Sequence, residues 1–294
     1  MTCAPDSPAG PSDAASPYGP AAPAPGARPA RPVRVHHLTR AKERGDRLTM
    51  LTAYDAVTAR ILDEAGTDML LVGDSIGNVM LGHDTTLPVE LDEMVVATRS
   101  VARATTRALV VADLPFGTYE AGPAQALVSA VRLMKAGANA VKLEGGRPRA
   151  HTVRLLGEAG IPVVGHLGFT PQSVNRLGGF RVQGRGEEAA EALVADAVAL
   201  AEAGAVAIVL EMVPEPVAAR ITELLAIPTI GIGAGARCDG QVLVWTDMAG
   251  MTQWAPRFAR RFGQVGQALR QAAQAYGEAV REGSFPTSEH SFDS

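Results

Sequence analysis

Ionisable and hydroxyl side chains recur along the chain where short apolar runs end. In chain order they are Asp74 with Ser75, Asp113, Lys142 with Glu144, His166, and Glu211. Short runs rich in β-branched residues and leucine are typical of strands, and the parallel strands of a barrel bring their carboxyl ends to one rim, where active sites form. We therefore expect five consecutive strands to deliver these groups to one site.

Three of these residues are carboxylates, and their chemistry predicts a bound cation. Asp74, Asp113 and Glu144 would repel one another in one barrel mouth unless a positive charge neutralised them. Ligands that are all oxygen atoms select a hard ion such as Mg2+, with water or substrate oxygens completing its coordination. The alternative is that each acid caps a helix or pairs with a surface arginine, which explains one such acid better than the whole set.

The remaining groups predict substrate binding and proton transfer. Lys142 and Glu144 are two residues apart, so strand alternation points both side chains to the same side, where Lys142 could hold an anionic substrate. Glu211 ends the apolar run that begins at Ala205, and partial desolvation there favours a general base. His166 could take that role instead, hydrogen-bond a substrate carboxylate, or be a strand-end histidine with a structural role.

Two glycine motifs suggest other chemistry. Residues 73–77 fit the G-x-S-x-G nucleophile elbow of hydrolases, but that motif needs a helix directly after the serine, and the stretch from Asn78 to Pro88 indicates a loop. Residues 231–236 resemble a dinucleotide loop. The chain, however, leaves no room for the helix that should follow such a loop, and it has no suitable acid about 20 residues later. We interpret the second motif as a glycine-rich turn that either lets a ligand approach the backbone or is an ordinary tight turn.

Eight apolar runs predict the strands that must position these residues. They are Met50–Ala53, Met69–Gly73, Leu109–Asp113, Ala140–Glu144, Pro162–His166, Ala207–Glu211, Pro228–Ile232 and Gln241–Val244. Alanine-rich amphipathic stretches separate them, which is the pattern of a parallel sheet with covering helices. Eight short strands in one domain of this length predict an α/β protein with a (β/α)8 TIM barrel rather than an open sheet.

Three connections carry further expectations. Apolar spacing from Leu91 to Val101 predicts a helix that begins at Pro88 and packs outside the barrel. The connection from Ile232 to Gln241 is shorter than the roughly 10 to 12 residues of a crossover helix, so we expect an irregular barrel there. Beyond Trp254, apolar residues recur through Val280 at helical spacing and predict a C-terminal helix that docks on the barrel or on another subunit.

The first 32 residues differ from the rest of the chain. They contain nine Pro, nine Ala and three Gly, and no Val, Ile, Leu or Phe occurs before Val33. Such a segment buries too little apolar surface to offset the entropy of ordering it. We therefore expect residues 1–32 to be a disordered tail and residues 33–294 to form the catalytic barrel with its C-terminal helix.

Composition excludes several classes of protein. The 294 residues have a net charge of −4, and 4% are aromatic, so the chain lacks the basic and stacking surface that nucleic acid needs. No apolar run approaches the roughly 18 to 20 residues of a membrane helix, and the first ten residues lack a signal-peptide pattern, which favours a cytoplasmic enzyme. Cys3 and Cys238 are too few for a disulfide framework or a thiolate metal site.

Several blocks in the same order resemble the ketopantoate (3-methyl-2-oxobutanoate) hydroxymethyltransferase family, over roughly Val33 to Pro286. The blocks are Met50–Asp55, Leu71–Ser75, Gly82–Pro88, Val111–Gly117, Val141–Gly146, Gly165–Gly168, Thr170–Asn175, Leu210–Glu211 and Gly231–Gly235. The resemblance implies a (β/α)8 barrel, a place in pantothenate synthesis, 5,10-methylenetetrahydrofolate as one-carbon donor, and a homodecamer. The Pro/Ala-rich tail is the one conspicuous departure from the family pattern.

The resemblance also implies roles for the residues that end the strands. Mg2+ would be held by Asp74, Asp113 and Glu144, substrate contacts would come from Asp74, Ser75, Asp113 and Lys142, and Glu211 would accept a proton. His166 is added as a substrate contact from its position alone. Two alternatives stay open: a Mg2+-dependent carbon–carbon lyase of 2-oxo acids similar to the isocitrate lyase group, and a non-catalytic barrel that binds small anions.

Overall fold

A computed structural model describes residues 31–292 of the chain. Eight parallel strands close into a barrel in chain order, with the last strand pairing with the first. The strands are β1 (Leu48–Thr52), β2 (Met69–Val72), β3 (Leu109–Asp113), β4 (Ala140–Glu144), β5 (Val163–Gly168), β6 (Ala207–Glu211), β7 (Thr229–Ile232) and β8 (Gly240–Leu243). The predicted (β/α)8 barrel is confirmed, and no predicted strand end differs from the observed one by more than two residues.

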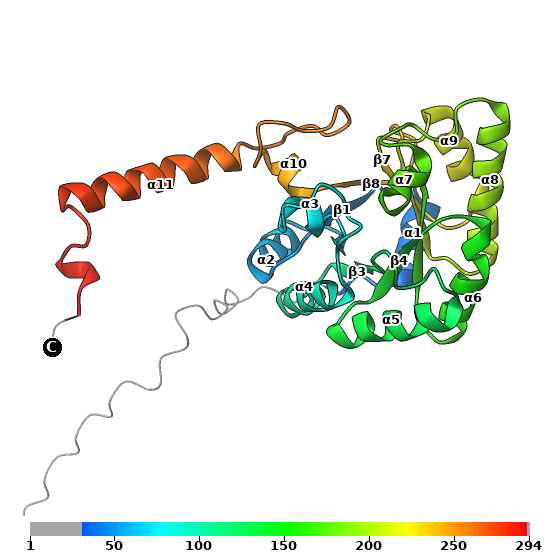
Figure 1. Cartoon of the computed structure of the whole chain (residues 1–294), viewed down its shortest axis with the longest axis horizontal. Helices are drawn as coiled ribbons and strands as arrows, with labels where there is room; N and C mark the ends of the chain where they lie inside the picture. The colour runs from blue at the N-terminus through cyan, green and yellow to red at the C-terminus, as the bar shows by residue number, and fades with distance from the viewer. Residues whose placement is uncertain (1–30, 293–294) are drawn as a thin grey trace, which may run out of the picture. The chain divides into compact units, whose positions relative to one another are not determined.

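Helices cover the outside of the barrel (Figure 1). The α-helices are α1 (Val35–Arg44), α2 (Ala56–Glu64), α3 (Ile76–Val79), α4 (Leu91–Ala104), α5 (Pro123–Ala136), α6 (Ala150–Glu158), α7 (Val174–Leu177), α8 (Glu187–Glu202), α9 (Glu215–Leu224), α10 (Trp245–Ala249) and α11 (Val265–Glu282). Three single 3-10 turns are η1 (Arg147–Arg149), η2 (Pro171–Ser173) and η3 (Ser288–His290). No helix within residues 31–292 combines the length and the apolar character needed to cross a membrane.

Alternation along the strands divides the apolar residues between two cores. Val141 and Leu143 of β4 belong to the larger core, between the sheet and the helices. Ala140 of β4 and Val111 of β3 belong to the smaller core, which fills the barrel interior. Lys142 and Glu144 have the same parity as Ala140, so both face the interior as predicted, and both are buried.

Local capping sets several helix boundaries. Asp55 begins α2 by accepting hydrogen bonds from the backbone N–H groups of Val57 and Thr58 at 2.8 and 2.9 Å. Glu90 and Glu93 form a reciprocal capping box at the start of α4, where the Glu90 N–H donates to Glu93 Oε2 at 2.9 Å. The prediction that this helix begins at Pro88 is therefore wrong by three residues, because the capping box fixes its start after Glu90.

The sequence predicts a disordered tail at one end of the chain and a docked helix at the other. The predicted tail falls almost wholly in residues 1–30, outside the residues that the structure describes. The C-terminal helix exists as α11, but Trp254, Phe258 and Phe262 precede it, and none of its residues is buried within the described chain. The expected docking of this helix on its own barrel is therefore not found. The link from β7 to β8 contains no helix, as its length predicts.

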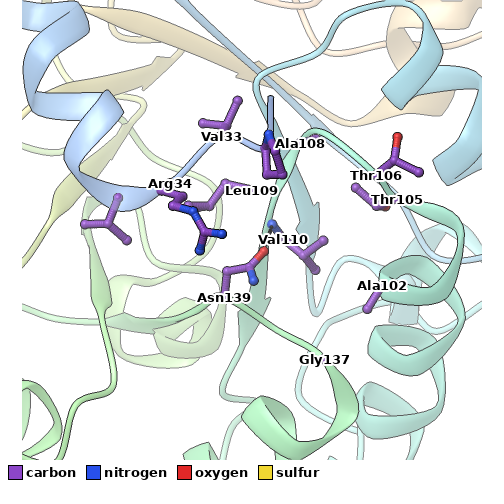
Figure 2. Close-up of a pocket in the computed structure, with 12 residues that line it drawn as sticks. Val33, Arg34, Ala102, Thr105, Thr106, Ala108, Leu109, Val110, Gly137 and Asn139 are labelled. Atoms are coloured by element: carbon purple, nitrogen blue, oxygen red, sulfur yellow. Dashed lines mark hydrogen bonds between the residues drawn. The ribbon is translucent and has the colours of Figure 1, made fainter. Parts of the chain in front are cut away.

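A cavity of about 330 Å³ lies where β3 and β4 begin, at the amino-terminal end of the barrel (Figure 2). Arg34, Thr105 and Asn139 line it, and the Asn139 side chain accepts a hydrogen bond from the Val110 N–H at 2.9 Å. Among the described residues that line this cavity, none is acidic and none is a histidine. It therefore lacks the side chains that the sequence singles out for chemistry.

Candidate active site

A second cavity, of about 720 Å³, opens at the carboxyl ends of the strands. All seven residues predicted for the site line it: Asp74, Ser75, Asp113, Lys142, Glu144, His166 and Glu211. The sheet register explains why they meet, since Asp113 pairs with Lys142 across β3 and β4, and Glu144 pairs with His166 across β4 and β5. Residues that pair in neighbouring parallel strands present their side chains to the same side of the sheet.

The inner part of this cavity holds a buried cluster of charges. Lys142 Nζ lies 2.9 Å from Asp113 Oδ1, with about 5% and 2% of the two side chains exposed. The Asp74 N–H donates a hydrogen bond to Asp113 Oδ2 at 3.0 Å, which joins the end of β2 to that of β3. Five carboxylates, those of Asp74, Asp113, Glu144, Glu211 and Asp247, thus line one cavity together with the Lys142 ammonium and the Arg257 guanidinium.

Burial controls the ionisation of this cluster. It raises the pKa of Asp74 and of Asp113 to about 6 and the pKa of Glu144 to about 8, and mutual repulsion among the carboxylates adds to the effect while Lys142 opposes it. Burial alone would lower the pKa of Lys142, but Asp113, Glu144 and Asp74 raise it above its ordinary value. Lys142 therefore keeps its positive charge. A second cation in the cavity would stabilise the ionised form of the carboxylates.

His166 bridges this cluster to Glu211. Its Nδ1 lies 3.3 Å from Lys142 Nζ and 3.2 Å from Glu144 Oε1, and its Nε2 lies 3.2 Å from Glu211 Oε2. Burial and the charge of Lys142 lower the pKa of His166, so the ring is neutral and carries one proton. Because an ammonium only donates, the Lys142 contact favours a lone pair on Nδ1 and the proton on Nε2, facing the Glu211 carboxylate; the Glu144 contact at Nδ1 fits this tautomer when Glu144 carries the proton that its raised pKa favours.

Sequence reasoning missed a second group of buried residues behind the carboxylates. The Gln172 side chain donates to Asp74 Oδ2 at 2.8 Å and to the Leu114 carbonyl at 3.0 Å, and its backbone N–H donates to Glu144 Oε2 at 3.0 Å. The Tyr119 hydroxyl donates to Gln172 Oε1, which fixes the orientation of the amide. Gln172 stands in the block Thr170–Asn175 that carries the family resemblance, which was the one signal that could have identified it.

The residues that follow Ser75 in the nucleophile-elbow motif differ from their prediction. A short helix, α3, does begin at Ile76 directly after Ser75, contrary to the loop expected there. The hydrolase interpretation still lacks its base, because Ser75 Oγ pairs with the Tyr54 hydroxyl at 2.8 Å, whereas His166 contacts Lys142, Glu144 and Glu211. Tyr54 is a further residue of the site that the sequence did not single out.

The fit of the site to a metal ion can be judged from its donors. Within residues 31–292, no group of three or more His, Cys, Asp or Glu side chains is placed to hold a metal ion as it stands. Asp113 Oδ1, however, is buried with the Lys142 ammonium, 2.9 Å away, as its charged partner, and the carboxylates that line the cavity outnumber its cations. Mg2+ is commonly held by one or two carboxylates together with water and substrate oxygens, so an incomplete cage of oxygen donors fits this ion.

Comparisons with known proteins agree with this geometry. A family model described as ketopantoate hydroxymethyltransferase matches residues 32–288. The chain is 60% identical over 261 residues to the 3-methyl-2-oxobutanoate hydroxymethyltransferase of Mycolicibacterium paratuberculosis, covering 88% of this chain and 91% of that protein. It is 59% identical to the Rhodococcus jostii enzyme of the same name, covering 88% and 90%.

The solved structures show a likeness in fold. A crystal structure of 2,3-dimethylmalate lyase, a member of the PEP mutase/isocitrate lyase superfamily, aligns with a TM-score of 0.55 over 88% of this chain and 91% of that one. The two sequences are 17% identical, so this likeness speaks for the barrel and not for the reaction.

Proposed function

The chain belongs to the ketopantoate hydroxymethyltransferase family, and on this premise we propose that it makes 2-dehydropantoate. The reaction joins 3-methyl-2-oxobutanoate, 5,10-methylenetetrahydrofolate and water, and releases tetrahydrofolate beside the product. The observation that carries the proposal is the single cavity in which Lys142 and Glu211 meet the carboxylates of Asp74, Asp113 and Glu144. We place the reaction in pantothenate biosynthesis, in the cytoplasm.

The acidic cluster supports a magnesium ion as cofactor. Asp74, Asp113 and Glu144 would hold Mg2+, as the family resemblance implies, since their oxygens line the cavity and suit a hard cation. When bound, the ion would stabilise the negative charge that develops on the keto oxygen as carbon 3 loses its proton.

The buried ammonium group of Lys142 supports binding of the 2-oxo acid. Lys142 is charged and buried, so it would attract the substrate carboxylate into the inner cavity. Asp74, Ser75, Asp113 and His166 line the same space and complete the proposed substrate contacts. The Ser75 hydroxyl, already oriented by Tyr54, would be a hydrogen-bond partner for a substrate oxygen.

Glu211 is the proposed proton acceptor. Its side chain is about 17% exposed, while the rest of the charge cluster is more deeply buried, so it stands nearer the open part of the cavity. The Nε2–H of His166 faces Glu211 Oε2 and would hold the carboxylate toward carbon 3 of the substrate. Once Glu211 has taken that proton, the electron pair left on carbon 3 forms the new bond to the methylene carbon of the folate. That step breaks one of the two carbon–nitrogen bonds of the methylene carbon, and the freed nitrogen takes up the proton that Glu211 removed. Water then supplies the hydroxyl group as the second carbon–nitrogen bond breaks, and the other proton of the water goes to that nitrogen, which releases tetrahydrofolate.

We also propose that the chain assembles as a homodecamer, as the family resemblance implies. The exposed apolar residues of α11, among them Leu269 and Tyr276, are compatible with burial against other subunits.

Product formation tests the proposed reaction. The protein would be incubated with 3-methyl-2-oxobutanoate, tetrahydrofolate and formaldehyde, with Mg2+ or with a chelator, and 2-dehydropantoate would be followed by NMR. We expect product only when the folate and Mg2+ are both present. Exchange of the carbon-3 proton with no folate-dependent product would favour the lyase alternative, and neither exchange nor product would favour an anion-binding barrel.

A further inference from the structure

The outer part of the active-site cavity has a different character from the charged interior. Beyond Glu211 it is lined by apolar side chains that include Phe180, Met212, Val244, Trp254 and Phe258. The whole cavity, at about 720 Å³, is much larger than a five-carbon acid needs. This outer part is therefore available to a second, larger and partly apolar molecule that must approach carbon 3.

Backbone geometry joins the proposed base to this outer part. Met212 directly follows Glu211 and has φ 48°, the left-handed conformation that a non-glycine residue adopts at some cost. The turn is held by the Met212 N–H, which donates to the Ile232 carbonyl at 2.9 Å, and by the Gln183 N–H, which donates to the Met212 carbonyl at 3.0 Å. The base and the apolar lining are thus consecutive residues of one fixed turn.

Aromatic rings line the same space from separate segments. Phe258 packs so closely on Gly233 that a Cβ at that glycine would lie 3.1 Å from the ring. Phe180 is 73% exposed, with its ring centroid 5.0 Å from that of the buried Phe169, and Trp254 is 75% exposed. Exposed large aromatic side chains around a cavity provide flat apolar surfaces that suit a planar ring system.

One carboxylate faces this outer part without a partner. Asp247 lies on α10, which is attached to the barrel by the Trp245 N–H donating to Thr52 Oγ1 at 3.0 Å. Asp247 lines the cavity and is half-buried, and burial raises its pKa, an effect that the charge of Arg261 opposes. Between residues 31 and 292 we find no side-chain hydrogen bond or ion pair of Asp247, so both of its oxygens are free to accept from a ligand.

Resting on the function proposed above, we infer that Asp247 binds the pterin ring of the folate co-substrate. The aminopyrimidine edge of a pterin presents two parallel N–H donors, which a carboxylate can accept with both oxygens at once. The faces of the ring would lie against the apolar and aromatic lining of the outer cavity. This placement would bring the methylene group that the folate carries between the pterin and the Glu211 side of the cavity.

The Asp247→Asn variant tests this inference directly. An amide keeps one acceptor but turns an NH2 group toward a donor of the pterin, so we expect tetrahydrofolate to bind roughly ten- to a hundredfold more weakly. Binding would be measured by titration calorimetry on the full chain with Mg2+ and 3-methyl-2-oxobutanoate present. The loss should be equally large for 6-methyltetrahydropterin, which lacks the aminobenzoyl-glutamate part of the folate.

Asp46→Asn is the matched control, because Asp46 is exposed and pairs with Arg44 away from the cavity. Unchanged or tighter binding of tetrahydrofolate by Asp247→Asn would overturn the inference, as would a loss seen with tetrahydrofolate and not with the pterin fragment. If the wild-type protein itself bound no tetrahydrofolate and formed no 2-dehydropantoate, the proposed function would fail, which is a separate result.

Discussion

At the scale of single residues, the site is organised by an excess of buried negative charge. Lys142 is the one ammonium among the described residues that line the cavity, and it faces the carboxylates of Asp74, Asp113 and Glu144. Such a cluster is costly to bury unless further positive charge binds. The same imbalance makes the cluster suitable for a divalent cation and for an anionic substrate that arrives with it.

Gln172 is expected to position two of the carboxylates. The Gln172→Leu variant removes the donor to Asp74 Oδ2 but keeps the backbone N–H that donates to Glu144 Oε2. Loss of such an outer hydrogen bond typically weakens metal binding by roughly 10- to 100-fold. Calorimetric titration with Mg2+ or Mn2+ checks this expectation without relying on turnover.

A second variant, Tyr119→Phe, distinguishes a positioning role of Gln172 from a general effect on folding. Tyr119→Phe removes the hydroxyl that orients the Gln172 amide but leaves the amide in place, so its effect on metal affinity should be smaller. Equal metal affinity in Gln172→Leu and wild-type protein would show that Asp74 needs no support from this side chain.

At the scale of elements, one buried aspartate connects helix α2 to the loop before strand β3. Asp63 of α2 accepts hydrogen bonds from the backbone N–H groups of Thr106, Arg107 and Ala108, which lead into β3. Burial alone would raise the pKa of Asp63, but these hydrogen bonds lower it below its usual value. The stabilisation is therefore present above the ordinary pKa of an aspartate and is lost as the pH falls.

Asp63→Asn is expected to lower the free energy of unfolding by about 1–3 kcal/mol, because one of the buried backbone donors loses its charged acceptor. Urea unfolding at pH 7 measures this loss. Asp92→Asn, on the exposed face of α4, is the matched control and should change stability far less. A loss of similar size in the two variants would contradict the proposed role of Asp63.

The strands were predictable, while several helix boundaries were not. β3, β4 and β6 match their predicted limits because each is a short apolar run that ends in a charged residue at the barrel rim. The start of α4 depends on a reciprocal contact between Glu90 and Glu93, which apolar periodicity does not reveal. The short helix α3 was missed because four residues are too few to show a helical repeat.

The candidate site was predictable only where strands end. Alternation and parallel strand order bring Asp113, Lys142 and Glu144 together, so spacing alone foretells that contact. Gln172 lies in the turn η2 after β5, and Tyr119 lies in the loop before α5, where no periodicity indicates which way a side chain points. Their contacts depend on tertiary packing and appear only in the structure.

At the scale of the whole molecule, the buried carboxylates couple stability to pH. The folded state raises the pKa of Glu144 to about 8, and those of Asp74 and Asp113 to about 6. Because the folded protein binds these protons more tightly than the unfolded chain does, stability is present at low pH and is lost as the pH rises through these values.

The metal-free protein should therefore melt at a lower temperature at pH 8 than at pH 6, by roughly 2–4 °C for each kcal/mol lost. Mg2+ should restore much of the difference, and Glu144→Gln should flatten the dependence. Calorimetric scans in chelator and in Mg2+ measure both effects. A melting temperature that is constant or rises over this range without metal would contradict the account.

Assembly should depend on the apolar face of α11. Leu269 and Tyr276 are 59% and 62% exposed in the single chain, which favours their burial in an oligomer. Leu269→Lys is expected to lower the native mass measured by light scattering, and Arg270→Lys, a neighbouring change that keeps the charge, is the matched control. A wild-type protein that is monomeric, or an unchanged mass in Leu269→Lys, would argue against this role.

Glu211 is the residue proposed to remove the carbon-3 proton of 3-methyl-2-oxobutanoate within this cluster. The most direct measurement follows deuterium exchange at carbon 3 by NMR in D2O, with Mg2+ and without folate, in the wild-type protein and in Glu211→Gln. We predict Mg2+-dependent exchange in the wild type, and a rate reduced at least about 100-fold in Glu211→Gln, which keeps the shape of the side chain but not its basicity. Near-normal exchange in that variant would contradict the account and move the search for the base to His166.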